Sequence, residues 1–214
     1  MGATNRFLIF VGGEPVPLSR FEGLVPHSIL VACDSGISTL LRNGLSPDFF
    51  LGDLDSVNPD VVLQFKGKIK GFFQFPIPKD KTDSELGVDL ALKENAEEII
   101  IIGGLGERLD HTLSNILLLL KIHQAGVKGQ IIGAKERIFL LPDLFELEAP
   151  PGSLFSLIPL GRVVSINILG ARFPLEDGEM VPGSTLGISN IIEGGILRVK
   201  KQGGPLFLVL LDAC

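Results

Sequence analysis

The pattern of hydrophobic and polar positions changes once along the chain, near residue 142. Before this point, short runs rich in branched and aromatic residues alternate with segments of helical periodicity, which is typical of a parallel sheet flanked by helices. The strands predicted in this region are 7–11, 29–33, 49–51, 72–75, 99–102 and 129–132. The predicted helices are 36–43, 59–65, 83–95 and 110–124.

Local signals mark the ends of several of these helices. Asn43-Gly44 and Ala125-Gly126 each place a residue that tolerates positive φ just past a helical run. Thr82 and Glu85 form a capping-box pattern, in which the threonine hydroxyl accepts a hydrogen bond at the start of the helix. Thr82 is therefore expected to begin the third helix.

After Pro142, short β-type stretches alternate with Gly and Pro turns, as in a β-sandwich or barrel. The strands predicted there are 154–158, 163–168, 187–192, 196–200 and 206–211. We predict an α/β fold in which an N-terminal parallel-sheet domain of the Rossmann-like type, residues 1–145, precedes a C-terminal all-β sandwich domain, residues 146–214.

Composition excludes several classes of partner. The net charge of −6 argues against general nucleic-acid binding, which needs a basic surface. No uninterrupted apolar stretch approaches the roughly 20 residues of a membrane span, and residues 1–6 do not begin a signal-peptide pattern. Two cysteines, Cys33 and Cys214, are too few for a disulfide framework. We therefore expect a cytoplasmic protein without a nucleic-acid or membrane partner.

Acidic side chains recur where predicted strands end or predicted helices begin. These residues are Asp34, Asp53, Asp55, Asp80, Asp83 and Asp110. In a strand, residues two apart face the same side, so Asp53 and Asp55 can converge on one point. Strand ends gather at one edge of a parallel sheet, and hard carboxylate oxygens suit Mg²⁺, which also bridges to phosphates. The pattern indicates a magnesium-phosphate site.

Three motifs lie in order along the α/β region, and two more follow in the β region. They are Gly52-Asp53-Leu54-Asp55-Ser56, Lys79-Asp80-Lys81-Thr82-Asp83, Gly103-Gly104 with Arg108-Leu109-Asp110-His111 and Asn115, Gly170-Ala171-Arg172-Phe173-Pro174-Leu175, and Ser189-Asn190. This ordered set resembles the thiamine pyrophosphokinase family. The resemblance implies a Mg²⁺-dependent transfer of the pyrophosphoryl group from ATP to the hydroxyl of thiamine, which gives thiamine diphosphate and AMP. It also implies a homodimer with the site between subunits.

The resemblance and the chemistry assign roles to individual residues. The expected metal ligands are Asp53, Asp55 and Asp83, and the expected catalytic residues are these three with Arg108 and Asp110. The residues expected at the ATP phosphates are Asp34, Asp80, Lys81, Thr82, Arg108, His111 and Asn115. The residues expected at thiamine are Phe173, Ser189 and Asn190. The sequence leaves open which aspartate ligates metal and which accepts the hydroxyl proton.

Other interpretations remain open at this point. Thr82 could serve only as a helix cap, Arg108 could pair with Glu107 or Asp110, and Ser189-Asn190 could be a hairpin turn. Glu107 and Ile191 depart from the usual family pattern, which keeps open a thiamine or nucleotide sensor without turnover. A Mg²⁺-dependent sugar-nucleotide transferase is the second alternative, because Asp-x-Asp serves that chemistry too.

Overall fold

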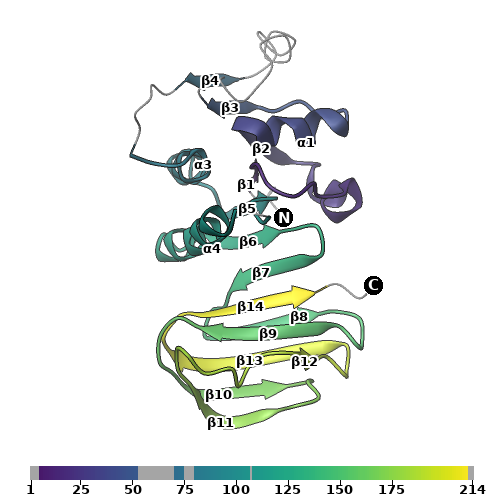
Figure 1. Cartoon of the computed structure of the whole chain (residues 1–214), viewed down its shortest axis with the longest axis vertical. Coiled ribbons are helices and arrows are strands. Elements are labelled where there is room, and N and C mark those ends of the chain that lie inside the picture. Colours follow the sequence, from purple (N-terminus) through teal and green to yellow (C-terminus); the bar gives the residue numbers. More distant parts are fainter. Residues whose placement is uncertain (1–4, 53–69, 75–79, 107, 212–214) are drawn as a thin grey trace. The chain divides into compact units, whose positions relative to one another are not determined.

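The computed structural model describes residues 5–52, 70–74, 80–106 and 108–211, with backbone alone for residues 72–74 (Figure 1). The chain forms two compact units, Met1–Ala134 and Lys135–Cys214. The two units are described separately. None of the helices in the described part of the chain has both the length and the apolar character needed to cross a bilayer.

The first unit contains a parallel sheet with the strand order β6-β5-β1-β2-β3-β4. Its strands are β1 (Arg6–Phe10), β2 (Ser28–Cys33), β3 (Phe49–Gly52), β4 (Gly71–Gln74), β5 (Glu98–Ile102) and β6 (Lys128–Ile132). The central strands are continuous apolar runs because both faces of a parallel sheet are covered. Phe7 of β1 lies opposite Ile29 on one side and Ile99 on the other.

The helices of the first unit follow these strands. They are α1 (Ile37–Arg42), α3 (Asp83–Lys93) and α4 (Leu109–Gln124), with short 3₁₀ turns at η1 (Leu18–Arg20), η2 (Glu22–Leu24) and η3 (Asp34–Gly36). Three predicted helices are thus confirmed, and the predicted helix 59–65 lies outside the described residues. Gly87 lets α3 approach the sheet closely, because a Cβ on it would lie 2.8 Å from Cys33 Sγ and 2.9 Å from Ile9 Cγ2.

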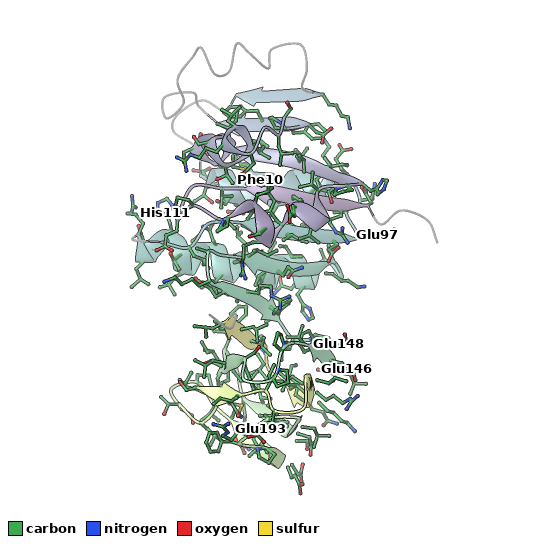
Figure 2. The ribbon with its side chains drawn as sticks, turned by 90° about the vertical axis from the view of Figure 1, so that its right-hand side faces the viewer. Phe10, Glu97, His111, Glu146, Glu148 and Glu193 are labelled. Atoms are coloured by element: carbon green, nitrogen blue, oxygen red, sulfur yellow. The ribbon has the colours of Figure 1, made fainter. Side chains whose placement is uncertain are left out.

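The order in which the chain adds strands to the sheet of the first unit reverses at β1. The chain proceeds from β1 through β2 and β3 to β4 on one side, and then returns to place β5 and β6 on the other side of β1. Ligands of open parallel sheets bind at such a switch point, outside the carboxyl ends of the strands. Figure 2 shows Glu97, which precedes β5, and His111, which follows it, on opposite sides of this unit.

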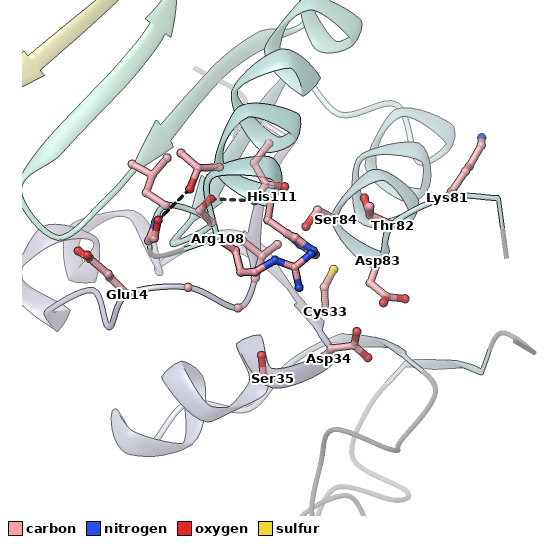
Figure 3. Close-up of a pocket in the computed structure, with 18 of the residues that line it drawn as sticks. Glu14, Cys33, Asp34, Ser35, Lys81, Thr82, Asp83, Ser84, Arg108 and His111 are labelled. Atoms are coloured by element: carbon pink, nitrogen blue, oxygen red, sulfur yellow. Dashed lines mark hydrogen bonds between the residues drawn. The ribbon is translucent and has the colours of Figure 1, made fainter. Parts of the chain in front are cut away.

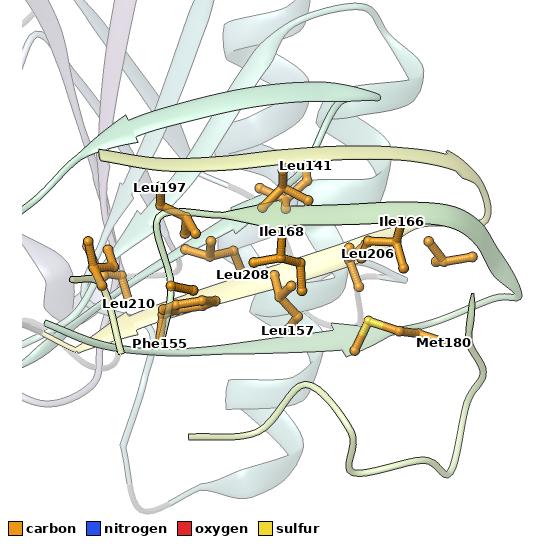
Figure 4. Close-up of a cluster of buried hydrophobic side chains, with 14 of the residues drawn as sticks. Leu141, Phe155, Leu157, Ile166, Ile168, Met180, Leu197, Leu206, Leu208 and Leu210 are labelled. Atoms are coloured by element: carbon orange, nitrogen blue, oxygen red, sulfur yellow. The ribbon is translucent and has the colours of Figure 1, made fainter. Parts of the chain in front are cut away.

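The second unit contains two antiparallel arrangements of strands. One has the order β12-β9-β14-β7 and the other β11-β10-β13-β8. The strands are β7 (Glu136–Leu140), β8 (Leu144–Glu148), β9 (Leu154–Pro159), β10 (Val163–Leu169), β11 (Leu175–Met180), β12 (Asn190–Ile191), β13 (Ile196–Gly203) and β14 (Leu206–Leu211). Buried side chains from both arrangements, including Phe155, Leu157, Ile166 and Leu197, form one hydrophobic cluster (Figure 4).

The mixed α/β class is confirmed, but some predicted elements of the second unit differ. The strands β7, β8 and β11 were not predicted, and the predicted strand 187–192 is reduced to the two residues of β12. In β8, Phe145 and Leu147 pack against the hydrophobic cluster and alternate with exposed residues, but Leu144 on the exposed face is also apolar, which weakens the alternating pattern. β8 pairs with β13, about 50 residues later, and the predicted boundary after residue 145 falls inside it.

Candidate active site

A cavity of about 870 Å³ lies in the first unit at the carboxyl ends of β1, β2 and β5 and at the starts of α3 and α4 (Figure 3). Its lining comes from segments 11–15, 33–35, 80–84 and 104–106, together with Arg108, His111, Thr112 and Asn115. The cavity therefore occupies the switch point of the parallel sheet. It gathers the predicted residues Asp34, Asp80, Lys81, Thr82, Asp83, Arg108, His111 and Asn115.

Segment 11–15 was not predicted as part of the site. The backbone N–H of Glu14 donates to the carbonyl of Leu105 at 2.8 Å, which joins this segment to the loop after β5. Gly13 has φ +151°, and a Cβ on it would lie 2.6 Å from the Leu105 oxygen. The signal available in the sequence was the pair Gly12-Gly13 directly after the first strand, where a parallel sheet binds ligands.

Two side chains of α4 hold the loop 103–106 in place. Asn115 is 5% exposed, and its Nδ2 donates to the carbonyl of Gly104 at 2.8 Å. Gly104 has φ +78°, and a Cβ on it would lie 2.8 Å from that nitrogen. The backbone N–H of Gly106 donates to Thr112 Oγ1 at 3.2 Å. Asn115 thus lines the cavity with its amide already bonded to the loop, and its role at the ATP phosphates stays a prediction.

Asp34 and Asp83 are the two carboxylates that Figure 3 shows directed toward one region of the cavity. Asp34 follows β2, and its Oδ1 would lie 2.3 Å from a Cβ on Gly52, so the absence of a side chain at the end of β3 makes room for it. Asp83 begins α3, where Thr82 Oγ1 accepts a hydrogen bond from the N–H of Glu85 at 3.2 Å. The predicted cap at Thr82 is confirmed.

Lys81 contacts the acidic face of α3. Its Nζ lies 2.7 Å from Asp89 Oδ2, and Lys121 of α4 lies 2.5 Å from Asp89 Oδ1 and 2.9 Å from Glu85 Oε1. Burial acts to raise the pKa of Asp89, but hydrogen bonds from Lys121 and Lys81 outweigh it and lower that pKa below its usual value. Figure 3 shows the Lys81 ammonium directed away from Asp34 and Asp83.

Arg108 and Asp110 form a bidentate pair at the start of α4. Arg108 Nε lies 2.9 Å from Asp110 Oδ1, and Nη2 lies 2.6 Å from Oδ2. The hydrogen bonds from Arg108 lower the pKa of Asp110 well below its usual range. Both side chains are exposed, so solvent screens the pair, and this structure bears out the interpretation in which Arg108 pairs with Asp110.

The predicted metal ligands fall only partly within the described residues. Asp83 lines the cavity, whereas Asp53 and Asp55 lie outside the part of the chain that the structure describes. Across residues 5–52, 70–74, 80–106 and 108–211, no group of three His, Cys, Asp or Glu side chains is placed to hold a metal ion. The cavity nevertheless presents the carboxylates of Asp34, Asp80 and Asp83, which are donors of the type that Mg²⁺ prefers.

Comparisons with known proteins match both units. "Thiamin pyrophosphokinase, catalytic domain" matches residues 23–131, and "Thiamin pyrophosphokinase, vitamin B1 binding domain" matches residues 145–202. The thiamine pyrophosphokinase of Bacillus subtilis (strain 168) is 30% identical over 167 residues, which cover 77% of this chain and 78% of the relative. The chain belongs to the thiamin pyrophosphokinase family.

Solved structures of the thiamin pyrophosphokinase family agree with this assignment. The structure from Bacillus subtilis has a TM-score of 0.88 at 27% identity and covers 98% of this chain and 100% of its own. The structure from Geobacillus thermodenitrificans has a TM-score of 0.84 at 29% identity and covers 97% and 98%. The family is an enzyme family that forms thiamine diphosphate with ATP, so the prediction of an enzyme of this kind is confirmed.

The residues predicted to contact thiamine all lie in the match to the vitamin B1 binding domain. Phe173 is 63% exposed, and Ser189 is exposed with its backbone N–H donated to Ser156 Oγ at 3.1 Å. Asn190 is instead 6% exposed, and its amide bonds to the backbone of Phe173. The structure thus joins Phe173 and Asn190, and directs the amide of Asn190 inward.

Proposed function

We propose that this chain transfers the pyrophosphoryl group of ATP to the hydroxyl of thiamine in a Mg²⁺-dependent reaction that gives thiamine diphosphate and AMP. The observation that carries the proposal is the cavity at the switch point of the sheet, which combines carboxylates, a cation and two helix starts within the match to the family's catalytic domain. In this proposal the first unit is a Rossmann-like nucleotide- and metal-binding domain, and the second unit binds thiamine.

Mg²⁺ is proposed as the cofactor because of the donors on the cavity wall. In Figure 3, Asp34 and Asp83 point toward one region of the cavity, and carboxylates of like charge that come close together repel each other. A divalent cation relieves this repulsion and screens the charge of the triphosphate. We propose Asp83, together with Asp53 and Asp55, as metal ligands, with Asp34 and Asp80 beside them.

The protein groups proposed to act on ATP are those that favour anions. The starts of α3, after Thr82, and of α4, after Arg108, carry residues that line the cavity, and the free backbone N–H groups of a helix start favour a phosphate. Arg108 can exchange the exposed carboxylate of Asp110 for phosphate oxygens, since its planar fork fits both. Lys81 would have to leave Asp89 to do the same, and His111 and Asn115 complete this side of the site.

We further propose a cytoplasmic homodimer in which the site lies between subunits, without nucleic acid or membrane as a partner. Support comes from α4, where Leu109, Leu113 and Leu117 are 66%, 52% and 48% exposed at a spacing of four residues. Such a spacing places them on one helix face, away from the face of α4 that carries His111, Thr112 and Asn115 on the cavity wall. A second copy that covers this stripe would pack on α4, whose first turn reaches the cavity.

The test is to incubate purified protein with ATP, Mg²⁺ and thiamine and to separate the products by chromatography. Thiamine diphosphate and AMP in equal amounts are expected, with no product after chelation of the metal. ADP as the sole nucleotide product would refute pyrophosphoryl transfer. Tight binding of thiamine without AMP would support a sensor, and turnover of a sugar nucleotide without thiamine would support the sugar-nucleotide transferase.

A further inference from the structure

Asn190 lies between two segments of the second unit that are far apart in the sequence. It is the first residue of β12, which pairs with β9 through Asn190 opposite Phe155. The other segment, residues 170–174, connects β10 to β11. We call this connection the Phe173 loop.

The amide of Asn190 is occupied by the protein backbone. Its Oδ1 accepts from the N–H of Phe173 at 3.1 Å and from its neighbour Ile191 at 2.8 Å, and its Nδ2 donates to the carbonyl of Phe173 at 2.7 Å. An amide oxygen has two lone pairs, so both are used. A ligand could donate to Oδ1 only by displacing one of these bonds. Nδ2 has a second hydrogen, but Asn190 is only 6% exposed, so little of the amide is open to a ligand.

Further bonds fasten the Phe173 loop to the same segment. The N–H of Arg172 donates to the carbonyl of Ile191 at 2.8 Å, and the N–H of Glu193 donates to the carbonyl of Gly170 at 2.9 Å. Gly170 has φ +78°, and a Cβ on it would lie 1.9 Å from the oxygen of Ile196, so the loop leaves β10 through a position that requires glycine. The backbone of the loop is therefore fixed at several points.

The side chain of Phe173 has the opposite environment. It is 63% exposed, although its backbone N–H and C=O are both held by one buried amide. An exposed aromatic ring on a fixed backbone is suited to stack on a flat heterocycle, because little conformational entropy is lost when the ligand binds. Leu186 and Ile188, which precede β12, are 60% and 45% exposed and add apolar surface to this segment.

We propose that Asn190 is a positioning residue, which holds the Phe173 loop so that the Phe173 ring presents its face to the heterocycle of the substrate. The amide does not contact the substrate. This inference rests on the proposed function, because it takes thiamine as the flat ligand. It replaces the expectation that Asn190 itself contacts thiamine.

The test compares Asn190→Ala with a matched control, Asn167→Ala. Asn167 also bridges backbone groups of the second unit, since its Oδ1 accepts from Asp177 N–H at 3.1 Å and its Nδ2 donates to the carbonyl of Ser165 at 3.1 Å. Asn190→Ala should raise the KM for thiamine about tenfold and leave the KM for ATP within about twofold. Asn167→Ala should leave both constants within about twofold. Equal effects of the two variants would mean a general loss of stability and would overturn the proposal.

A double-mutant cycle with Phe173→Ala separates positioning from contact. If Asn190 acts through the ring, Asn190→Ala should raise the KM for thiamine no further once Phe173 is alanine. Additive effects would show that Asn190 contacts the substrate independently, and would overturn the proposal. Should Asn190→Ala fail to fold, Asn190→Ser, which retains a side-chain oxygen, replaces it in the same cycle.

Hydrogen exchange supplies a readout that does not depend on turnover. The amide of Phe173 donates to Asn190 Oδ1, so Asn190→Ala should accelerate its exchange about tenfold or more, and Asn167→Ala should not. Unchanged exchange in Asn190→Ala would refute the positioning role even if the wild-type protein made no thiamine diphosphate. Absence of thiamine diphosphate with accelerated exchange would refute the proposed function alone.

Discussion

Replacing Asn115 by alanine should destabilise the first unit by a predictable amount. The side chain is 5% exposed, and Nδ2 donates to the carbonyl of Gly104 at 2.8 Å, so the substitution leaves a carbonyl without its donor in the interior. Loss of such a bond with an unsatisfied buried acceptor costs about 2 kcal/mol. For a protein of this size, that cost corresponds to a fall in Tm of about 4–8 °C.

Differential scanning calorimetry measures this shift, and Ser114→Ala, one position away on α4, is the control. If the two units unfold separately, only the transition of the first unit should move. The loop 103–106 lines the cavity, so kcat/KM for ATP should also fall about tenfold as the loop loses its anchor. A Tm within about 1 °C of wild type would refute the reasoning, since a buried bond of this length cannot be removed at no cost.

Other predictions concern the remaining charges and the exposed stripe. Asp83→Asn should lower kcat at least about a hundredfold in the product assay, because a charged oxygen ligand is lost; unchanged kcat would exclude Asp83 as a metal ligand. Leu113→Lys with Leu117→Lys should turn the proposed dimer into monomers in sedimentation velocity, and a persistent dimer would place its interface elsewhere. The fold lowers the pKa of Asp89. The ionised carboxylate of Asp89 therefore stabilises the fold fully at pH values above the ordinary pKa of 3.8, and this stabilisation is lost as the pH falls through the lowered pKa. In calorimetry, the Tm of the wild type should therefore exceed that of Asp89→Asn at neutral pH, and this difference in Tm should shrink below pH 3.8. A difference in Tm that grew in acid would contradict the ion-pair assignment.

Local chemistry was sufficient for several features. The continuous apolar runs of β1 and β5 indicated a parallel sheet, and the pair Thr82 and Glu85 indicated where α3 begins. These signals act between residues that are close in the sequence, so they can be interpreted without knowing the rest of the fold. The ordered motifs also identified the family, and with it several of the residues that line the cavity, although not segment 11–15.

Tertiary structure alone decided how those residues are used. Lys81 meets Asp89 eight residues along the chain and shares it with Lys121 of another helix, while the amide of Asn190 turns inward to the loop of Phe173. The strand β8 forms because β13, about 50 residues later, supplies its partner. Sequence patterns determine periodicity and local capping, but the partner of a long side chain or an edge strand depends on which distant segments the fold brings together, and no local pattern encodes that.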